Sequence, residues 1–437
     1  MVTAVAPDSG ERMYQFIERL YPICRSITGE GVRQTLAIVG EHIPIERREI
    51  PSGTPVFDWT VPNEWNIRDA YVKNSRGERV IDFRRHNLHV VNYSVPVRVT
   101  MPLAELRKYL HSLPEHPDWI PYRTSYYRET WGFCLAHKDL ERLEDGEYEV
   151  YIDSILAPGS LSYGEYRLPG ESSEEVLLYT HVCHPSLCND NLSGIALLTY
   201  LAMWLEGRSR RYSYRFVFAP GTIGAITWLS LNENVLGRIR HGLVVGLLGD
   251  RGGFTYKRSR RGDAEIDRIV SYALRVTGVV HEVVDFTPYG YDERQFCSPG
   301  INLPVGRLTR TPNGAYPEYH SSADNLDLVH PSSLQESLTL CATIVDLIEK
   351  NRTYVNTNPK CEPQLGKRGL YRQVGGIKDP GQREYALLWL LNQSDGTHSL
   401  FDIAERSGIE FMSLVAAAAD LEACGLLLPV GSTVERR

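Results

Sequence analysis

The amino-acid sequence predicts an α/β protein with a mostly parallel sheet, a β-rich inserted domain and a C-terminal winged helix. Three observations support this fold class: a long stretch of alternating strands and helices, an earlier stretch of short β-like segments, and a three-helix pattern after a polar linker. The 437 residues leave ample room for several domains. The expected boundaries are 1–46 plus 146–352 for the α/β domain, 47–145 for the insertion, 353–380 for the linker and 381–437 for the winged helix.

The chain opens with helical periodicity and then changes texture. Between residues 11 and 43, apolar residues such as Met13, Phe16 and Leu20 recur on one face of a helix. From about Arg47 the chain forms segments such as SGTPVFDWTVP and HNLHVVNYSVPV, in which β-branched and aromatic residues are interrupted by Pro, Gly and Asn. This change predicts a separate β-rich module.

In the α/β stretch, apolar strands alternate with amphipathic helices. The strands are EEVLLYTH, YRFVFAP, HGLVVGLLGD and NLPVGRLTR, and the helices are IALLTYLAMWLE, DAEIDRIVSYALRVTG and PSSLQESLTLCATIVDLIEKN. Such alternation predicts a largely parallel sheet that is covered on both faces. Ligands in this architecture gather at the carboxyl ends of strands, where His181, His184, Pro220–Thr222 and Asp250 lie.

The last domain combines three short helical patterns with a terminal GLLLPV strand, as in a winged helix-turn-helix. Ser399 is placed to cap the second helix and Gly408 to end it. Acidic residues outnumber basic ones from residue 381 onward, so the domain lacks the counterion release that dominates DNA affinity. We therefore expect protein–protein or intramolecular packing rather than DNA binding.

The composition is that of an ordinary globular protein, for which we expect neither nucleic acid nor a membrane as partner. Hydrophobic residues make up 42% of the chain and charged residues 23%, with a net charge of -7 and a pI near 6.0. The start MVTAVAPDSGERM lacks the basic and apolar regions of a signal peptide, and no apolar run is long enough to span a membrane. The eight scattered cysteines include no CxxC pair, which predicts reduced thiols and a cytoplasmic location. The sequence allows a homo-oligomer.

The run VLLYTHVCHPSLCNDNLSG at residues 176–194 is the strongest candidate for a metal site. His181 and His184 end an apolar strand, and Asp190 follows in a polar turn before a helix. Imidazole nitrogen and carboxylate oxygen both suit zinc. Because histidines at a strand end point in different directions, we expect one to bind the metal and the other to bind substrate or orient a ligand. The alternative is that both histidines satisfy backbone groups near the turn.

Two further segments carry candidate ligands. In PEYHSSADN, residues 317–325, His320 is placed to complete the site, with Asp324 as a helix cap or as an acceptor behind a metal ligand. In LLGD, residues 247–250, Asp250 follows an apolar strand. The alternative for Asp250 is an ordinary turn residue.

Four longer phrases carry a family resemblance. They are RSITGEGVRQTL (25–36), PSGTPVFDWTVPNEWNIRDAYV (51–72), TSYYRETWGFCL (124–135) and EYHSSADN (318–325). The chain is similar to a bacterial group described as having an aminopeptidase-like domain, in which a β-rich insertion follows the first helices and a winged helix closes the chain. Residues 146–350 resemble the zinc aminopeptidases of the co-catalytic exopeptidase clan. The resemblance covers essentially the whole chain and implies a zinc-exopeptidase-like, three-layer domain.

The pattern of this clan carries over to named positions. His181 or His184 matches the strand-end histidine, and Asp190 matches the bridging carboxylate before Asn-x-Ser-Gly. Asp250 matches the later acidic ligand and His320 the distal histidine. The resemblance therefore implies a zinc centre at this end of the sheet.

The chain departs from the clan at its Glu-Glu pair, where it has Gly221 and Thr222. In the clan the first glutamate is the general base and the second binds a metal, so the resemblance here implies one zinc ion rather than two. Another acid must then move protons, a role worth about 10²–10⁴-fold in rate. The candidates for this role are Glu318 and Glu293.

Candidate substrate-binding residues lie on two loops. TPYGYDERQFCSPG, which is similar to the clan's segment before its substrate pocket, contains Tyr289, Tyr291, Asp292 and Arg294. Arg310 and Tyr316 precede His320. An arginine near a metal could hold a substrate carboxylate in a bidentate clamp. The alternative is an exposed loop with routine salt bridges.

Two functional classes follow. The first is a zinc-dependent, aminopeptidase-like hydrolase that cleaves an amide, such as an aminoacyl or peptide-like group on a small metabolite in a biosynthetic route. The second is a catalytically degenerate relative that binds a ligand or partner through the same cleft. Because both glutamates are missing, the sequence predicts a metal more firmly than it predicts peptidase activity.

Overall fold

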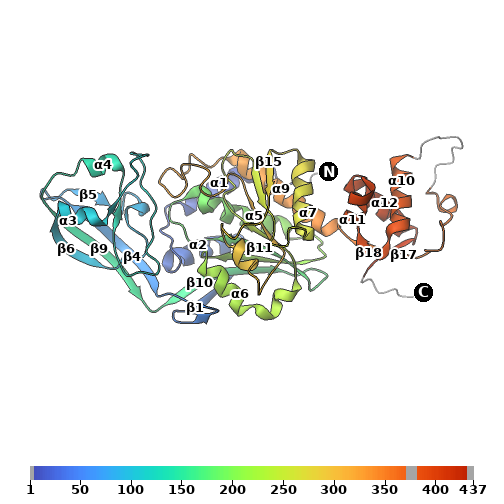
Figure 1. The fold of residues 1–437 in the computed structure, drawn as a ribbon, viewed down its shortest axis with the longest axis horizontal. Coiled ribbons are helices and arrows are strands. Elements are labelled where there is room, and N and C mark those ends of the chain that lie inside the picture. Colours follow the sequence, from blue (N-terminus) through green and yellow to red (C-terminus); the bar gives the residue numbers. More distant parts are fainter. Residues whose placement is uncertain (1–3, 371–380, 431–437) are drawn as a thin grey trace. The chain divides into compact units, whose positions relative to one another are not determined.

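A computed structural model describes residues 4–370 and 381–430 of the chain. The chain divides into two compact units, Met1–Thr343 and Ile344–Arg437. The first unit contains the α/β domain with its β-rich insertion, and the second contains the winged helix (Figure 1). None of the described helices is long and apolar enough to cross a membrane.

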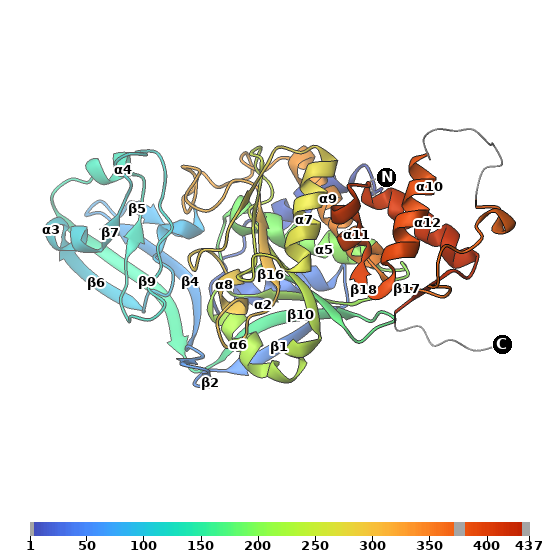
Figure 2. The ribbon, with the colours of Figure 1, turned by 45° about the vertical axis from the view of Figure 1, so that its right-hand side comes forward.

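An eight-stranded mixed sheet forms the centre of the first unit (Figure 2). In spatial order its strands are β1 (Glu46–Pro51), β10 (Ser160–Leu168), β12 (Ser213–Ala219), β11 (Glu175–His181), β13 (Ile239–Val245), β16 (Val305–Thr309), β14 (Phe254–Lys257) and β15 (His281–Val284). The four strands expected from the sequence are the parallel neighbours β12, β11, β13 and β16. Strands β10 and β14 join this parallel centre antiparallel, one on each side.

Helices cover both faces of this sheet, because alternate side chains of each strand point to opposite faces. The helices of this domain are α1 (Ser9–Leu20), α2 (Glu30–Gly40), α5 (Ser193–Leu205), α6 (Ile223–Leu231), α7 (Glu265–Thr277), α8 (Glu293–Phe296) and α9 (Pro331–Lys350). On β11, Leu177 and Tyr179 point toward α6 and α8, and Tyr179 meets Phe296 edge to face at 5.2 Å. Thr180 points to the other face, where its hydroxyl accepts a hydrogen bond from Asn191 Nδ2 at 2.7 Å just before α5. The expected three layers are therefore present.

The insertion has a sheet and a core of its own. Its strands pair in the order β5-β4-β9-β6, with β4 at Glu64–Lys73, β5 at Arg79–Asp82, β6 at Val97–Pro102 and β9 at Glu147–Ala157. Shorter elements are β2 (Pro55–Val56) with β3 (Trp59–Thr60), β7 (Leu110–His111) with β8 (Phe133–Cys134), α3 (Leu103–Leu106) and α4 (His137–Glu141). Val72 and Val150, on neighbouring strands, pack with Phe133 in a buried core.

The insertion lies slightly later in the chain than the expected range 47–145. Strand β1 pairs with β10 in the main sheet, so the insertion begins after Pro51. Strand β9 pairs with β4 and β6, so the chain returns to the α/β domain after Ala157 rather than at residue 146. The sequence does not locate these boundaries, because strands of similar composition lie on both sides of each one and their pairing partners are distant in the sequence.

The second unit is a small helical domain with a three-stranded sheet of order β18-β17-β19. Its elements are β17 (Thr353–Asn356), α10 (Gln382–Gln393), β18 (Asp395–Ser399), α11 (Leu400–Ser407), α12 (Phe411–Ala423) and β19 (Leu427–Pro429). Asp402 N donates to Ser399 Oγ at 3.2 Å, and Gly408 ends α11 with φ of 72°, which confirms both predicted caps. The expected linker 353–380 is wrong at its start, because β17 pairs with both other strands, and residues 371–380 lie outside the described part of the chain.

Candidate metal centre

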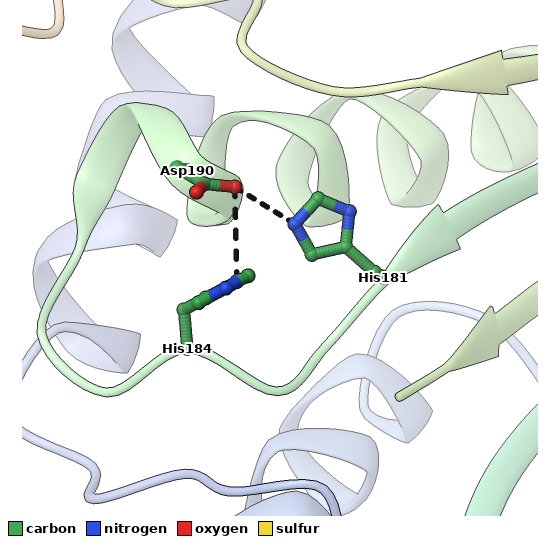
Figure 3. A group of neighbouring side chains, drawn as sticks. All are labelled: His181, His184 and Asp190. Atoms are coloured by element: carbon green, nitrogen blue, oxygen red, sulfur yellow. Dashed lines mark hydrogen bonds and ion pairs between the residues drawn. The ribbon is translucent and has the colours of Figure 1, made fainter. Parts of the chain in front are cut away.

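Three histidines and one aspartate converge at the carboxyl end of β11. His181 is the last residue of that strand, His184 lies in the following loop, Asp190 precedes α5, and His320 lies between β16 and α9. Asp190 Oδ1 lies 2.8 Å from His181 Nε2 and 3.7 Å from His184 Nδ1 (Figure 3). Asp190 Oδ2 lies 3.0 Å from His320 Nε2. The structure thus brings both strand-end histidines to the carboxylate, whereas the sequence led us to expect only one.

The charge states of these groups suit a zinc ion. Burial opposes ionisation of Asp190, but the nearby His184 and the hydrogen bonds from His181 and His320 outweigh it and hold the pKa of Asp190 well below its usual value. Burial also lowers the pKa of His184 to about 3, so this imidazole is neutral. The ligand atoms of His181, His184 and Asp190 lie within 4.8 Å of one another. An ionised carboxylate beside the neutral imidazole of His184 and two further histidines is a donor set that fits zinc.

Asp324 holds the turn that carries Asp190. The backbone N–H groups of Asn189 and Asp190 donate to Asp324 Oδ1 and Oδ2 at 2.6 and 2.9 Å. Asp324 is fully buried, so these donors depend on it for an acceptor. The expectation that Asp324 accepts hydrogen bonds behind a candidate ligand is confirmed, and the donors belong to the backbone.

Two asparagines in the same turn position the site, and sequence reasoning missed both. Asn191 Nδ2 lies 3.2 Å from His181 Nδ1 and donates to His181 O at 2.9 Å. Leu247 N donates to Asn191 Oδ1 at 3.3 Å, and Gly249 N donates to Asn189 Oδ1 at 2.9 Å. The turn is therefore tied to the end of β13. In the sequence, only the two asparagines that flank Asp190 indicate that this turn is held by side-chain hydrogen bonds.

The insertion forms the wall beside His320. Tyr122 N donates to His320 O at 2.8 Å, and the Tyr122 ring meets the rings of His320 and His184 edge to face at 5.1 and 5.3 Å. His320 has φ of 57°, in the left-handed region that is costly for a residue with a Cβ. Contacts from the insertion thus help to hold a strained residue at the site. No local pattern identifies Tyr122 as a member of the site.

Two residues assigned to the site from the sequence have other roles. Asp250 Oδ2 accepts from Asn189 Nδ2 at 3.0 Å, and its Oδ1 accepts from Thr311 Oγ1 at 2.7 Å. Arg310 is buried and pairs with Glu336. The structure therefore gives no support to Asp250 as a metal ligand or to Arg310 as a substrate clamp, because both side chains are engaged with other partners.

The two glutamates proposed as proton carriers differ in their surroundings. Glu293 is fully buried in an ion pair with Lys257, whose Nζ also donates to Tyr289 O at 2.8 Å. A carboxylate committed to a buried ion pair is poorly suited to exchange protons with a substrate. Glu318 is partly exposed two residues before His320, and its catalytic role stays a prediction.

Aromatic rings pack against the histidines. The ring of Tyr291 stacks on His181 with centroids 4.8 Å apart, and its hydroxyl donates to Tyr319 Oη at 3.3 Å. Tyr319 stacks on His320 at 3.9 Å. Tyr316 is buried and meets Tyr319 edge to face at 5.7 Å. Tyr291 thus contacts the cluster directly, whereas Tyr316 packs against Tyr319, which in turn stacks on His320.

Asp292 faces the position where the sequence lacks a glutamate. A Cβ built on Gly221 would lie 3.1 Å from Asp292 Oδ2 and 3.4 Å from His181 Cβ. Asp292 is buried, and neither of its carboxylate oxygens has a hydrogen-bond partner within the described chain. The Tyr179 hydroxyl lies beside Asp292, interacts with its carboxylate and also donates to Ala219 O at 3.4 Å. Burial raises the pKa of Asp292 to about 6.

A cavity of about 700 Å³ borders the cluster at Gly221 and Thr222. Trp59, Tyr126 and Tyr127 of the insertion line it together with residues of the α/β domain. The insertion therefore contributes to the surroundings of the site, a role that the sequence left undecided.

Comparison with known proteins gives a family and a fold. A family described as a domain of unknown function, DUF4910, matches residues 14–351, and a family described as winged helix-turn-helix matches residues 352–429. A protein of Clostridium acetobutylicum named "Putative polysaccharide biosynthesis protein with aminopeptidase-like domain" is 56% identical over 420 residues, which cover 96% of each chain.

Solved structures agree with these matches. A crystal structure from Clostridium acetobutylicum, described as a "putative peptidase", has a TM-score of 0.90 at 54% identity and covers 97% of this chain and 98% of that one. A zinc aminopeptidase from Bacillus subtilis has a TM-score of 0.57 at 12% identity and covers 78% of this chain and 95% of that one, so it shares the fold alone. The predicted aminopeptidase-like fold with a C-terminal winged helix is confirmed.

Proposed function

The chain belongs to the DUF4910 family, and on this premise we propose that it is a zinc-dependent hydrolase that cleaves an amide of an aminoacyl or peptide-like group on a small metabolite. The observation that carries the proposal is the buried cluster in which Asp190 meets His181, His184 and His320. Catalytic zinc sites commonly use three such protein ligands and keep one position for water or substrate. The cluster also lies at the carboxyl end of a parallel strand, where ligands of this architecture bind.

One zinc ion would be held by Asp190 with His181 and His320, whose Nε2 atoms lie 2.8 and 3.0 Å from its carboxylate oxygens. His184, whose Nδ1 lies 3.7 Å from Asp190 Oδ1, would be the alternative nitrogen ligand. When bound, zinc supplies a Lewis acid that polarises the amide carbonyl. Asp324 keeps the Asp190 carboxylate in place through the backbone of its turn. The ring of Tyr291 helps to bury His181, which strengthens the electrostatic interaction of this imidazole with Asp190.

Proton transfer is assigned to Asp292. Its Oδ2 occupies the space beside Gly221 that a side chain at this position would enter, and both of its oxygens are without hydrogen-bond partners in the described chain. The carboxylate is therefore available to hold a proton at Oδ2 near the cluster. It is preferred to Glu293, which is committed to Lys257.

A biosynthetic substrate is proposed in preference to general peptide turnover. The support is the relative whose name places it in polysaccharide biosynthesis, which is 56% identical to this chain over nearly the whole length of both proteins. The three-part organisation is consistent with one dedicated substrate, because Tyr122 of the insertion packs against His184 and His320 of the cluster.

The proposal is tested by turnover of a panel of aminoacyl and N-acyl amides with the full-length protein, either zinc-loaded or treated with a chelator. We expect zinc-dependent release of amine that is abolished in Asp190→Ala and reduced in Asp292→Asn. The exposed Asp285→Asn, which removes a surface carboxylate paired with Arg258, serves as the matched control. Zinc-dependent ligand binding without hydrolysis of any amide would contradict the proposal and favour a degenerate relative.

A further inference from the structure

The cavity beside Gly221 has aromatic walls. Its volume of about 700 Å³ is in the range of small-molecule sites. Trp59 and Tyr127 of the insertion and Phe286 of the α/β domain contribute rings to its lining. The rings of Trp59 and Tyr127 lie 5.3 Å apart, and these residues are 44% and 60% exposed. Exposed rings of this kind offer flat surfaces on which a sugar or aromatic ring can stack.

The cavity is also cationic. Arg260 and Arg294 line it, and no acidic residue does so in the described chain. Arg260 Nη1 is engaged with Asn302 Oδ1 at 3.1 Å. Arg294 Nε is buried and has no hydrogen-bond partner among the described residues. The neighbouring Asp292 interacts with the Arg294 charge but accepts no hydrogen bond from Arg294 Nε.

A buried N–H of a charged group is costly when it has no acceptor. Arg294 sits on the short helix α8, at the cavity and next to the candidate proton carrier. A ligand carboxylate or phosphate is the natural acceptor for a guanidinium, since both can bind it in a bidentate manner.

We propose that this cavity binds the anionic end of the substrate, with Arg294 pairing with a carboxylate or phosphate while the adjoining ring stacks on Trp59 and Tyr127. Gly221 lies in the cavity wall and against His181, so a substrate held here extends toward the cluster. The substrate clamp that the sequence assigned to Arg310 is thereby transferred to Arg294. The inference rests on the proposed function for the scissile bond, but the binding step can be measured without turnover.

The test is isothermal titration calorimetry of the full-length protein with phenyl phosphate, phenylacetate and 2-phenylethanol. These compounds share a ring and differ in charge, and the first two distinguish a phosphate from a carboxylate. We expect at least one anion to bind about 10- to 100-fold more tightly than the alcohol, as charge-assisted hydrogen bonds allow. Arg294→Gln should abolish this preference. Arg258→Gln removes a nearby surface cation paired with Asp285 and should leave it intact.

Two results would overturn the inference: equal or absent binding of the three compounds by the parent, or an anion preference that survives in Arg294→Gln. If Arg294→Gln does not fold, the same titrations with Trp59→Ala test the inference. Weaker binding of all three compounds with the anion preference retained supports the inference, and unchanged binding contradicts it. Anion-selective binding without hydrolysis of any amide would refute the proposed function and leave this inference standing.

Discussion

Removal of the Asp324 carboxylate tests how the turn that carries Asp190 is held. In Asp324→Ala, the N–H groups of Asn189 and Asp190 lose the acceptors that now lie at 2.6 and 2.9 Å. Each buried N–H left without an acceptor costs about 1–3 kcal/mol, so the free energy of unfolding should fall by about 2–6 kcal/mol. Burial and repulsion from Asp190 raise the pKa of Asp324 to about 8. Because Asp324→Ala also removes these two unfavourable effects, we expect a loss of unfolding free energy near the lower end of that range.

Zinc affinity reports the positioning role of Asp324 separately from stability. A loosened turn should lower the affinity about 10- to 100-fold, the usual effect of losing a partner that orients metal ligands. Asp324→Asn keeps one acceptor oxygen and should fall between the parent and Asp324→Ala. Urea unfolding followed by circular dichroism measures the first quantity, and competition with a zinc-binding dye measures the second. The exposed Asp327→Ala is the control. An unchanged zinc affinity in Asp324→Ala would refute the reasoning.

Three further predictions concern single groups and the metal. Asp292→Asn should lower kcat about 10²- to 10⁴-fold with zinc affinity retained, and an unchanged kcat would remove Asp292 from the mechanism. Burial lowers the pKa of His241 from 6.5 to about 3. Between these values only the unfolded chain takes up the proton, so stability should fall by about 2 kcal/mol from pH 8 to pH 5 through this group. His241→Leu should remove that loss, whereas the exposed His281→Leu should not, as urea unfolding at both pH values will show. Zinc at a free concentration about 100 times its Kd should stabilise the protein by about 2.7 kcal/mol, and a melting temperature that a chelator leaves unchanged would argue against the site.

The centre of the fold could be predicted because strands buried on both faces are continuous apolar runs. Strand β11 is an example, since all of its residues are buried. The limits of the insertion could not be predicted, because β9 has the same texture as its neighbours and only its pairing with β4 assigns it to the insertion. Strand β17 was placed in the linker for the same reason: its partners lie about 40 and 75 residues further along the chain.

The candidate site was predictable where its residues follow a strand or share a short motif. His181, Asp190 and His320 were identified in this way and do meet in space. The ion pair of Arg310 with Glu336 could not be predicted, because Glu336 lies on a helix whose packing the sequence does not specify. Arg294 lies in the TPYGYDERQFCSPG loop that the sequence indicates as part of the pocket, but its place at the cavity could not be derived, since the cavity is lined by a loop and an insertion far apart in the chain.

The central claim, that this cluster binds zinc, is tested most directly by elemental analysis of the purified full-length protein. We expect about one equivalent of zinc in the parent and a large loss in both Asp190→Ala and His320→Ala, because each variant removes a ligand. Less than about half an equivalent in the parent, unchanged in the two variants, would contradict it.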